Sequence, residues 1–484
     1  MFLDQDVAFK SYYSQKIFDN RHYQKNIETM KKHFLPLLFL FTAFFVQGFL
    51  QAQNRIWTLE NCIEYALQNN IQIKQSELNI EASGVSLLES KLSLLPSLNS
   101  SAGYSYNWGR YLDQALNFYV DRETRQGNLG LNANLVLFAG LQKQNVIKKQ
   151  KIEFQSSKYA TDKMKDDISL MLTQAYLSIL FNRELLKVAR EQVVISDAQI
   201  ARTEKLVAAG TLARGSLLEI QAQNASEELA VINYENSLDL AYLDLLQFLD
   251  LPYDTDFEID VPVIDIEITG ELPTLATVYT LASERLPQIK KAELDVESAY
   301  KDVAIAKGRL SPTLSLVSGW GTNYSSNFPD LDTTSANFGE VMAFGDQVRN
   351  NQSRYLGLNL SIPIFNGYQA SSNVSLAKIS ATNAEYNYQL TLNTLRKSIE
   401  QAYSDARGAY KSYVATRQSL TSFQESFRYT EQKFNVGLSN SLDYNIAKTQ
   451  LASVESELIR ARYDYIFKLK ILEFYMGLPL TLSR

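Results

Sequence analysis

Two stretches of this sequence follow one plan: RTEKLVAAGTLARGSLLEIQAQ (Arg202–Gln223) and YTEQKFNVGLSNSLDYNIAKTQ (Tyr429–Gln450). Each carries a helical pattern up to one glycine, Gly210 or Gly437, and resumes it a few residues later. The two glycines are 437 − 210 = 227 residues apart. Glycine readily adopts the left-handed backbone with which many helices end. We therefore expect two helical hairpins, each turning at one of these glycines.

The duplication reaches well beyond the hairpins. At the same offset, LGLNANLVLFAG (Leu129–Gly140) aligns with LGLNLSIPIFNG (Leu356–Gly367). Further upstream, IQIKQSEL (Ile71–Leu78) aligns with PQIKKAEL (Pro287–Leu294) at an offset of 287 − 71 = 216. The second copy therefore contains 227 − 216 = 11 extra residues, located between its strand-forming segments. Repeats of this length indicate a structure built from two equivalent halves.

The repeat boundaries follow from these alignments. Residues 1–29 are predicted to be an upstream extension that is not part of the mature protein, and residues 30–52 are predicted to be a signal peptide. The first repeat, 53–265, is predicted to contain a helix, strands over about 97–138, a long helix 141–209, a hairpin end 210–215 and a returning helix 216–250. The second repeat, 266–484, is predicted to contain a helix 275–310, strands over about 313–365, a long helix 368–436, a hairpin end 437–442 and a returning helix 443–476.

The long helices carry a seven-residue apolar repeat. No glycine or proline occurs between Gly140 and Gly210, and the matching run in the second repeat contains only Gly408. The apolar series is Leu172, Ile179, Leu186, Val193, Ile200 and Val207, and its copy is Ile399, Ala406, Tyr413, Leu420, Phe427 and Phe434. A repeat sustained over this length is typical of a coiled-coil seam.

The strand segments alternate with period two. In YLGLNLSIPIF, Leu356, Leu358 and Leu360 alternate with glycine, asparagine and serine. The segments that begin after Pro96 and Pro312 likewise place leucine and aromatic residues on one face. A half-buried soluble sheet and a membrane-spanning strand with one lipid face both predict this alternation. Four strands cannot enclose a membrane barrel, and open edges in lipid are costly, so spanning strands would have to be pooled by several chains.

Composition excludes several classes of protein. The net charge of −6 argues against a nucleic-acid binder. The segment Met30–Gln53 has a basic start, an apolar run and a small residue near its end, as secretory signals do. If Met30 starts translation and the segment is cleaved, the two histidines, His22 and His33, are absent from the mature chain. Histidine-dependent catalysis and imidazole metal sites are then excluded, and we expect neither an enzyme nor a cofactor or metal site. Cys62 is expected to be a buried residue of a helix.

The duplicated plan, the FxG that ends each second strand and the glycine-centred hairpins resemble the TolC family of outer membrane efflux proteins, over about Trp57–Leu480. The resemblance implies an α+β membrane protein, internally duplicated, with a coiled-coil periplasmic α-barrel. It also implies that four β-strands per chain join a twelve-stranded trimeric barrel in the outer membrane of a Gram-negative bacterium. The implied partners are two further copies, outer membrane lipid, a periplasmic adaptor protein and an inner-membrane pump of the RND or ABC type.

The same resemblance implies site residues. The entrance and adaptor-docking ends would involve Gly210, Arg214, Ser216, Val436, Gly437, Leu438 and Asp443. The junctions between barrel and helices would involve Pro96, Phe138, Gly140, Pro312, Phe365 and Gly367. Asp443 matches the family position that contributes an acidic ring, which would attract cations. An alternative role for Asp443 is the N-cap of the returning helix. The sequence departs from the family at Ser216 and Ile446, where acids are common.

The sequence leaves several functions open. The resemblance implies the exit duct of a tripartite efflux pump for small molecules, and the outlet of a type I protein secretion system is an alternative. A secreted coiled-coil structural protein or adhesin is an alternative of another class. Segments Gly109–Gln126 and Ser325–Arg354 are predicted to be external loops, and Asp330 and Asp332 in the second lack the ordered spacing of a calcium site. The exported substrate is not encoded in any recognisable motif.

Overall fold

The computed structural model describes residues 56–113, 118–121, 123–253, 257–262 and 272–482. The upstream extension and the predicted signal peptide lie outside these residues. The chain divides into two compact units. In the smaller unit, Trp57 pairs with Ile259 as an isolated parallel bridge, and the Trp57 and Phe257 rings lie 5.4 Å apart. The larger unit contains every named helix and strand.

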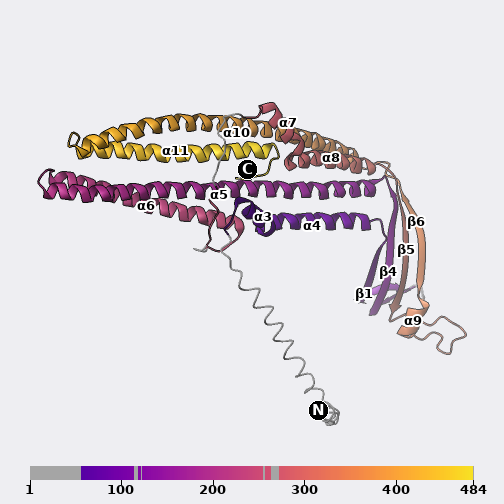
Figure 1. Ribbon diagram of the computed structural model, residues 1–484. Coiled ribbons are helices and arrows are strands. Elements are labelled where there is room, and N and C mark those ends of the chain that lie inside the picture. The colour runs from indigo at the N-terminus through magenta and orange to yellow at the C-terminus, as the bar shows by residue number, and fades with distance from the viewer. Residues whose placement is uncertain (1–55, 114–117, 122, 254–256, 263–271, 483–484) are drawn as a thin grey trace, which may run out of the picture. The chain divides into compact units, whose positions relative to one another are not determined.

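Each repeat supplies two short helices, two long strands and two long helices to the larger unit (Figure 1). The first repeat contributes α3 (Leu59–Asn69), α4 (Ile71–Leu92), β1 (Ser97–Asn107), β4 (Thr124–Ala139), α5 (Gln142–Ala208) and α6 (Arg214–Leu249). The second contributes α7 (Leu275–Arg285), α8 (Pro287–Gly308), β5 (Thr313–Ser325), β6 (Ser353–Ser361), α10 (Gln369–Asn435) and α11 (Ser441–Tyr475). None of the described helices is long and apolar enough to cross a membrane.

Some element boundaries differ from those that the sequence suggested. The helix expected over 275–310 is interrupted at Leu286, whose backbone is extended because the following Pro287 disfavours helical geometry there. In the first repeat the break falls at Asn70, whose side chain caps α4. The segments expected to be loops contain structure as well: a hairpin of β2 (Arg110–Asp113) and β3 (Phe118–Asp121), and the short helix α9 (Phe344–Asn350).

The four long strands form one antiparallel sheet in the order β1-β4-β5-β6. Its register aligns the expected apolar positions across all four strands: Leu98 lies opposite Ala133, Leu131 opposite Trp320, and Leu316 opposite Leu358. One face of the sheet therefore carries the leucines and most of the aromatic residues, with small residues such as Ala133 and Ser318 among them. The other carries mostly serine, asparagine and glycine. The sequence alternation thus belongs to one continuous sheet with one apolar and one polar face.

One large side chain lies across the polar face. The Tyr355 hydroxyl on β6 donates a hydrogen bond to the side-chain oxygen Oδ1 of Asn132 on β4, 3.0 Å away. Between them lies Gly319 of β5, where a Cβ atom would come within 2.3 Å of the Tyr355 ring. Glycine is therefore required at position 319 for the tyrosine to cross the strand.

Helix α5 holds the first repeat and the second together. It contacts α6, α4 and α3 from its own repeat and α8 and α11 from the other. Its middle is an apolar core, with Leu172, Tyr176 and Ile179 fully buried. Cys62 of α3 is buried, as expected, and burial raises the pKa of its thiol to about 12. A thiol with this pKa is protonated and unreactive at neutral pH.

Candidate functional site

The two hairpin ends have the same backbone geometry. Gly210 (φ +70°) follows α5 and Gly437 (φ +79°) follows α10. The Gly210 N–H bonds to the Val207 carbonyl and the next N–H reaches back five residues, both at 3.0 Å. The second end repeats both bonds, at 3.1 and 2.8 Å. This pair of backbone hydrogen bonds is the Schellman motif, and it satisfies carbonyls that a helix end would otherwise leave without partners.

The returning helices begin differently. Helix α11 has Asn440 as its N-cap, whose side chain accepts a hydrogen bond of 2.7 Å from the Asp443 amide. The alternative role suggested for Asp443 is therefore wrong: it lies three residues inside the cap, where its charge favours the helix dipole. The corresponding residue of the first repeat is Ala213 (440 − 227), and it makes no side-chain cap.

The second end exposes apolar side chains. Val436 is 69 % exposed, Leu438 78 % and Leu442 58 %. Asp443 and Ile446 are exposed on the first turns of α11. At the first end, Arg214 is exposed and Ser216 half-buried at the start of α6. The two ends therefore present different chemistry: the second is mainly apolar with one acid, and the first combines Arg214 with an exposed Leu218 and Glu219.

Contacts just above the ends join the two hairpins. Arg202 of α5 donates hydrogen bonds to Asn435 of α10, and Ser441 of α11 donates one to Glu219 of α6. Between them lies an aromatic cluster in which the Phe434 and Tyr444 rings stack at 4.9 Å. Burial raises the pKa of Tyr444 to about 12, and the nearby Glu431 and Glu227 charges add to the rise. The tyrosine therefore stays neutral in this cluster.

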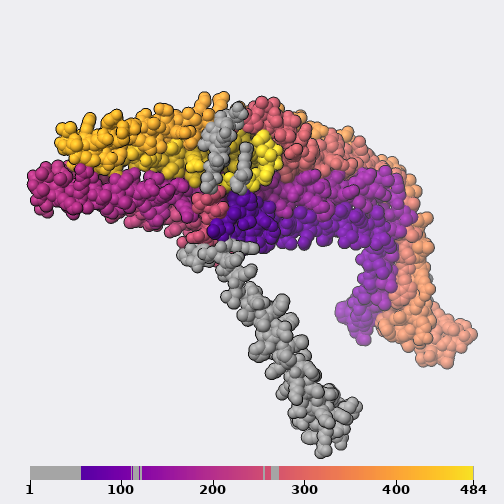
Figure 2. Space-filling view, viewed as in Figure 1, coloured from indigo at the N-terminus to yellow at the C-terminus, as the bar shows by residue number. Residues whose placement is uncertain are grey.

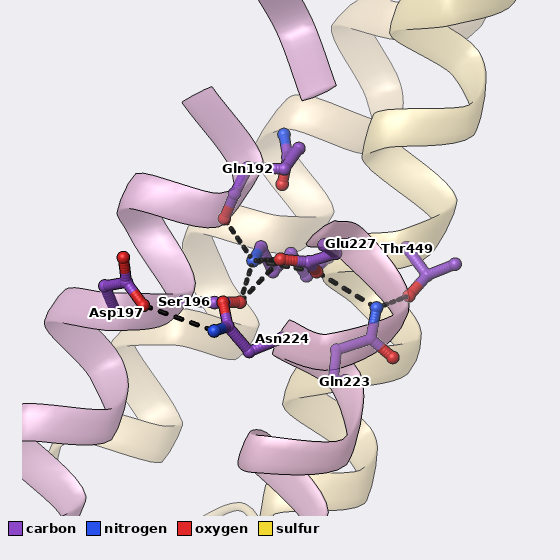
Figure 3. Close-up of polar contacts among 8 residues, drawn as sticks. Gln192, Ser196, Asp197, Gln223, Asn224, Glu227 and Thr449 are labelled. Atoms are coloured by element: carbon purple, nitrogen blue, oxygen red, sulfur yellow. Dashed lines mark hydrogen bonds and ion pairs between the residues drawn. The ribbon is translucent and has the colours of Figure 1, made fainter. Parts of the chain in front are cut away.

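A buried ion pair lies further from the ends, where α5, α6 and α11 meet. The Lys448 ammonium of α11, 2 % exposed, donates to both Glu227 carboxylate oxygens of α6, at 2.9 and 3.0 Å. It also donates to Ser196 Oγ (2.6 Å) and the Gln192 carbonyl (2.9 Å) on α5. Figure 3 shows the Ser196 and Glu227 side chains turned toward one another between the helices, and the backbone carbonyl oxygen of Gln192, not its side chain, pointing toward them. We call Gln192, Ser196, Glu227 and Lys448 the polar knot.

The two charges of the polar knot are paired with each other, although the buried side-chain oxygen of Gln192 has no hydrogen-bond partner. Burial lowers the pKa of the Lys448 ammonium, and the Glu227 carboxylate opposes that change through hydrogen bonds and charge. Glu227 also accepts hydrogen bonds from Ser196 Oγ (2.7 Å) and Gln223 Nε2 (3.0 Å). Because every charge has a partner, the pair is tolerated at a depth where a lone charge would not be. Sequence reasoning missed this cluster, although Lys448 stands alone in the otherwise uncharged run YNIAKTQLAS.

The junctions between sheet and helices use a second pair of left-handed residues. Gly140 and the following Leu141 both have positive φ, as do Gly367 and Tyr368. These residues turn the chain from strand into helix at equivalent points of the two repeats. Phe138 pairs with Leu314 beside a β-bulge, whereas Phe365 is 87 % exposed. Pro96 and Pro312 each directly precede the first residue of a strand, where proline is tolerated.

A two-faced sheet attached to long paired helices that end in glycine-centred hairpins defines a class of protein: the subunit of an outer membrane channel with a helical periplasmic portion. The sequence model of the family described as outer membrane efflux protein matches residues 62–249 and 278–478. The chain belongs to this family. Among the described residues, no group of histidine, cysteine and acidic side chains could hold a metal ion.

Known relatives agree with this assignment. The chain is 22% identical to the outer membrane protein TolC of Salmonella enteritidis over 447 residues, which is 92% of this chain and 86% of the relative. It is 24% identical over 421 residues to the proteases secretion protein PrtF of Dickeya chrysanthemi, covering 83% and 84%. The solved structure of the CusC channel superimposes with a TM-score of 0.72 at 18% identity, covering 89% and 95%. The protein is thus an outer membrane efflux channel with a large periplasmic helical portion.

Proposed function

We propose that three copies of the chain assemble into one channel that serves as the exit duct of a tripartite efflux pump for small molecules. The observation that supports the assembly is that the sheet is open: β1 and β6 each have one partner strand. In lipid an unpaired strand edge leaves backbone groups without hydrogen bonds, at several kcal/mol each. The edges of one copy must therefore be paired by another.

The internal repeat predicts the missing pairing. Within the chain, Ala133 of β4 lies opposite Ser318 of β5. Their repeat counterparts are Leu360 (133 + 227) on β6 and Ala102 (318 − 216) on β1. If β6 of one copy meets β1 of the next in this register, both residues fall on the apolar face. The apolar, lipid-facing surface would then continue from one copy to the next with no shift in strand register.

The helices predict the same neighbour. Helix α5 packs against α8, and the counterparts of these two helices are α10 and α4. Those two helices carry exposed apolar residues along their free faces: Leu78, Val85, Leu88 and Leu92 on α4, and Leu376, Ile379, Tyr386 and Leu390 on α10. Helix α10 of one copy is therefore expected to cover α4 of the next.

Three copies suit the sheet better than two. Two copies would pool 2 × 4 = 8 strands, and a barrel of that size is filled by its own side chains. Three would pool 3 × 4 = 12 and leave a polar lumen lined by the serine, asparagine and glycine face. The experiment is electrophoresis of outer membranes without heating, where a trimer that dissociates on heating is expected. A monomer recovered from the aqueous fraction without detergent would overturn the proposal.

The hairpin ends would form the entrance and the adaptor-docking surface. The exposed Val436, Leu438 and Leu442 offer an apolar contact to a partner helix, and Asp443 lies beside them. Three copies would place three Asp443 carboxylates around one axis and attract cations. We expect Asp443→Ala to lower the cation selectivity of single channels in planar bilayers. Unchanged selectivity would restrict Asp443 to the first turn of α11.

A second candidate is the outlet of a type I protein secretion system, with an ABC-type pump behind it. It is supported by the similarity to a relative named for protease secretion. Sensitivity of a deletion strain to drugs and metal ions separates the candidates. Efflux predicts increased sensitivity restored by the intact gene. Secretion predicts the loss of a protein from the culture medium with unchanged sensitivity.

A further inference from the structure

The loop between β5 and β6 is a folded structure. It contains the 11 residues by which the second repeat exceeds the first. Its first half forms a short hairpin in which Pro329 bridges Val341, and the Met342 amide bonds to the Phe328 carbonyl at 3.0 Å. Its second half is helix α9. Figure 1 shows α9 beside the ends of β5 and β6 that are remote from the long helices.

Helix α9 replaces the strand that β5 lacks at this end. Pairing of β6 with β5 stops at Gly321, four residues before β5 ends. Beyond that point Gln347 of α9, fully buried, accepts a hydrogen bond from the Ser325 amide (2.9 Å). Its Nε2 atom donates to the Ser325 carbonyl (3.0 Å). Both backbone groups of Ser325 are thereby satisfied by one glutamine side chain, and the Asn323 carbonyl accepts a hydrogen bond from Asn351 Nδ2 (3.0 Å).

The contacts of α9 place it on the apolar side of the sheet. Thr322 and Tyr324 share the face of Trp320, which is the apolar face. The Thr322 hydroxyl donates to the Val348 carbonyl (2.8 Å), and the Tyr324 and Phe344 rings meet edge-to-face at 5.1 Å. Helix α9 therefore extends the apolar face at the outer ends of the strands.

This extension leaves large apolar side chains bare. Leu331 is 61 % exposed, Phe338 56 %, Val341 58 % and Phe344 64 %. We call these four residues the outer loop surface. Basic residues lie next to it: the Arg349 side chain on α9 is 76 % exposed and forms a loose, exposed ion pair with Asp346 (3.8 Å), and Arg354 lies opposite Trp320 on the apolar face. Aromatic residues with basic neighbours at the end of a lipid-facing surface are typical of the membrane interface.

We propose that the outer loop surface inserts into the outer leaflet of the membrane, at the boundary between the acyl chains and phosphate-bearing headgroups. This proposal rests on the membrane-spanning strands of the proposed function, because the apolar face fixes the lipid side of the sheet. Continuity with that face favours lipid over a second copy as the occupant. The arginines would then meet the phosphates while the aromatic rings lie just below them.

The test uses nitroxide labels on single cysteines. The native Cys62 is replaced first, by Cys62→Ala, and labels are attached through Phe338→Cys and, separately, Val341→Cys. The full-length channel is reconstituted in vesicles of phosphatidylcholine and phosphatidylglycerol. Collision with oxygen, which partitions into lipid, is compared with collision with a water-soluble nickel chelate. Both labels are expected to favour oxygen, as a lipid-facing residue does.

Matched sites make each outcome decisive. Leu356→Cys on the apolar face is the lipid reference, and Asp332→Cys, an exposed residue of the same loop, is the water reference. Labels at 338 and 341 that collide with nickel as readily as the label at 332 would overturn the proposal. Labels shielded from both reagents would indicate a contact with another copy and would overturn it as well. Failure of the Leu356 label to favour oxygen would instead refute the membrane-spanning strands themselves.

Discussion

Helices α5 and α10 are copies of one another that meet different surroundings. Gln142 and Ala208 bound α5, and their counterparts at +227, Gln369 and Asn435, bound α10. Yet Ile152 of α5 is 9 % exposed and its counterpart Ile379 is 66 % exposed. The difference arises because α5 lies between the two repeats, whereas one side of α10 is covered by none of the helices that the structure describes. Because the two repeats do not close on themselves, the apolar face that is buried on α5 of the first repeat stays exposed on α10 of the second.

The glycines at the heads of these helices show the same difference. A Cβ atom on Gly140 would lie 2.4 Å from the Gly308 carbonyl of α8, so the junction of α5 is packed tightly. A Cβ atom on Gly367 would meet nothing within 4 Å. The counterpart of Gly308 is Leu92 (308 − 216), at the end of α4 and 51 % exposed. In the proposed trimer, Leu92 of the adjacent copy would approach Gly367.

The largest predicted effect comes from placing a charge on the exposed apolar face of α10. Ile379→Asp is expected to abolish the trimer while each chain keeps its helices, because the new carboxylate would be buried only on assembly. Unheated electrophoresis measures the trimer and circular dichroism measures the helices. Ile379→Leu conserves volume and should keep the trimer. A stable trimer of Ile379→Asp would show that this face lies outside the interface.

The two hairpins also differ in the seams between their helices. The first seam contains Ser196 and Glu227, and the second contains Phe423 (196 + 227) and Val454 (227 + 227) at the equivalent positions. Lys448 of the second hairpin reaches into the polar seam of the first. The largely buried Glu227 of the first hairpin thus depends on a lysine of the second to balance its charge. The equivalent seam of the second hairpin is apolar and needs no such residue from the first.

Lys448→Met should therefore destabilise the hairpins by about 3–5 kcal/mol, because the Glu227 carboxylate would be left largely buried without a cation to pair with. Thermal unfolding followed by circular dichroism gives the change. The double variant Lys448→Met with Glu227→Val copies the apolar seam of the second hairpin and should recover most of the loss. If the double variant is less stable than Lys448→Met, the pair is not the source of the effect.

The sequence predicted the repeated plan, the four strands and their two faces, because periodicity and spacing are local properties of the chain. It located the glycine turns for the same reason, since a left-handed residue is a local requirement. It did not reveal the polar knot, which depends on the rotation of α11 against α5 and α6. Nor did it place the cap of α11, where Asn440 and Asp443 are both good capping residues and only the geometry distinguishes them.

A pH-dependent difference separates α5 from α10 at one position. Burial raises the pKa of Asp166 from 3.8 to about 6, and the nearby Asp162 and Asp167 charges add to the rise. The counterpart in α10 is Asn393 (166 + 227), which cannot ionise. Because the folded pKa exceeds the unfolded one, the folded state loses stability as the pH rises from about 4 to 6.

Asp166→Asn should therefore stabilise the chain above pH 6. The full shift corresponds to at most about 3 kcal/mol, and about 1–2 kcal/mol is expected because the half-buried carboxylate is partly screened. Unfolding temperatures of the two proteins should converge as the pH falls toward 4. A difference that does not vary with pH would assign the effect to packing rather than ionisation.

The smallest predicted effect comes from substitutions that make the N-caps of the two returning helices alike. Asn440 caps α11 through its side chain, and its counterpart Ala213 gives α6 no such bond, although the preceding Schellman turns are the same. Asn440→Ala should cost about 1 kcal/mol, and Ala213→Asn should gain a similar amount. Hydrogen exchange of the amides in the first turns of α6 and α11 measures both changes locally. Since α11 carries Asp443 and Lys448, loosening its first turn should also shift channel opening, whereas tightening α6 should not. Equal effects of both substitutions on conductance would mean that the two ends move as one body, and the asymmetry between the hairpins would then have no bearing on the entrance.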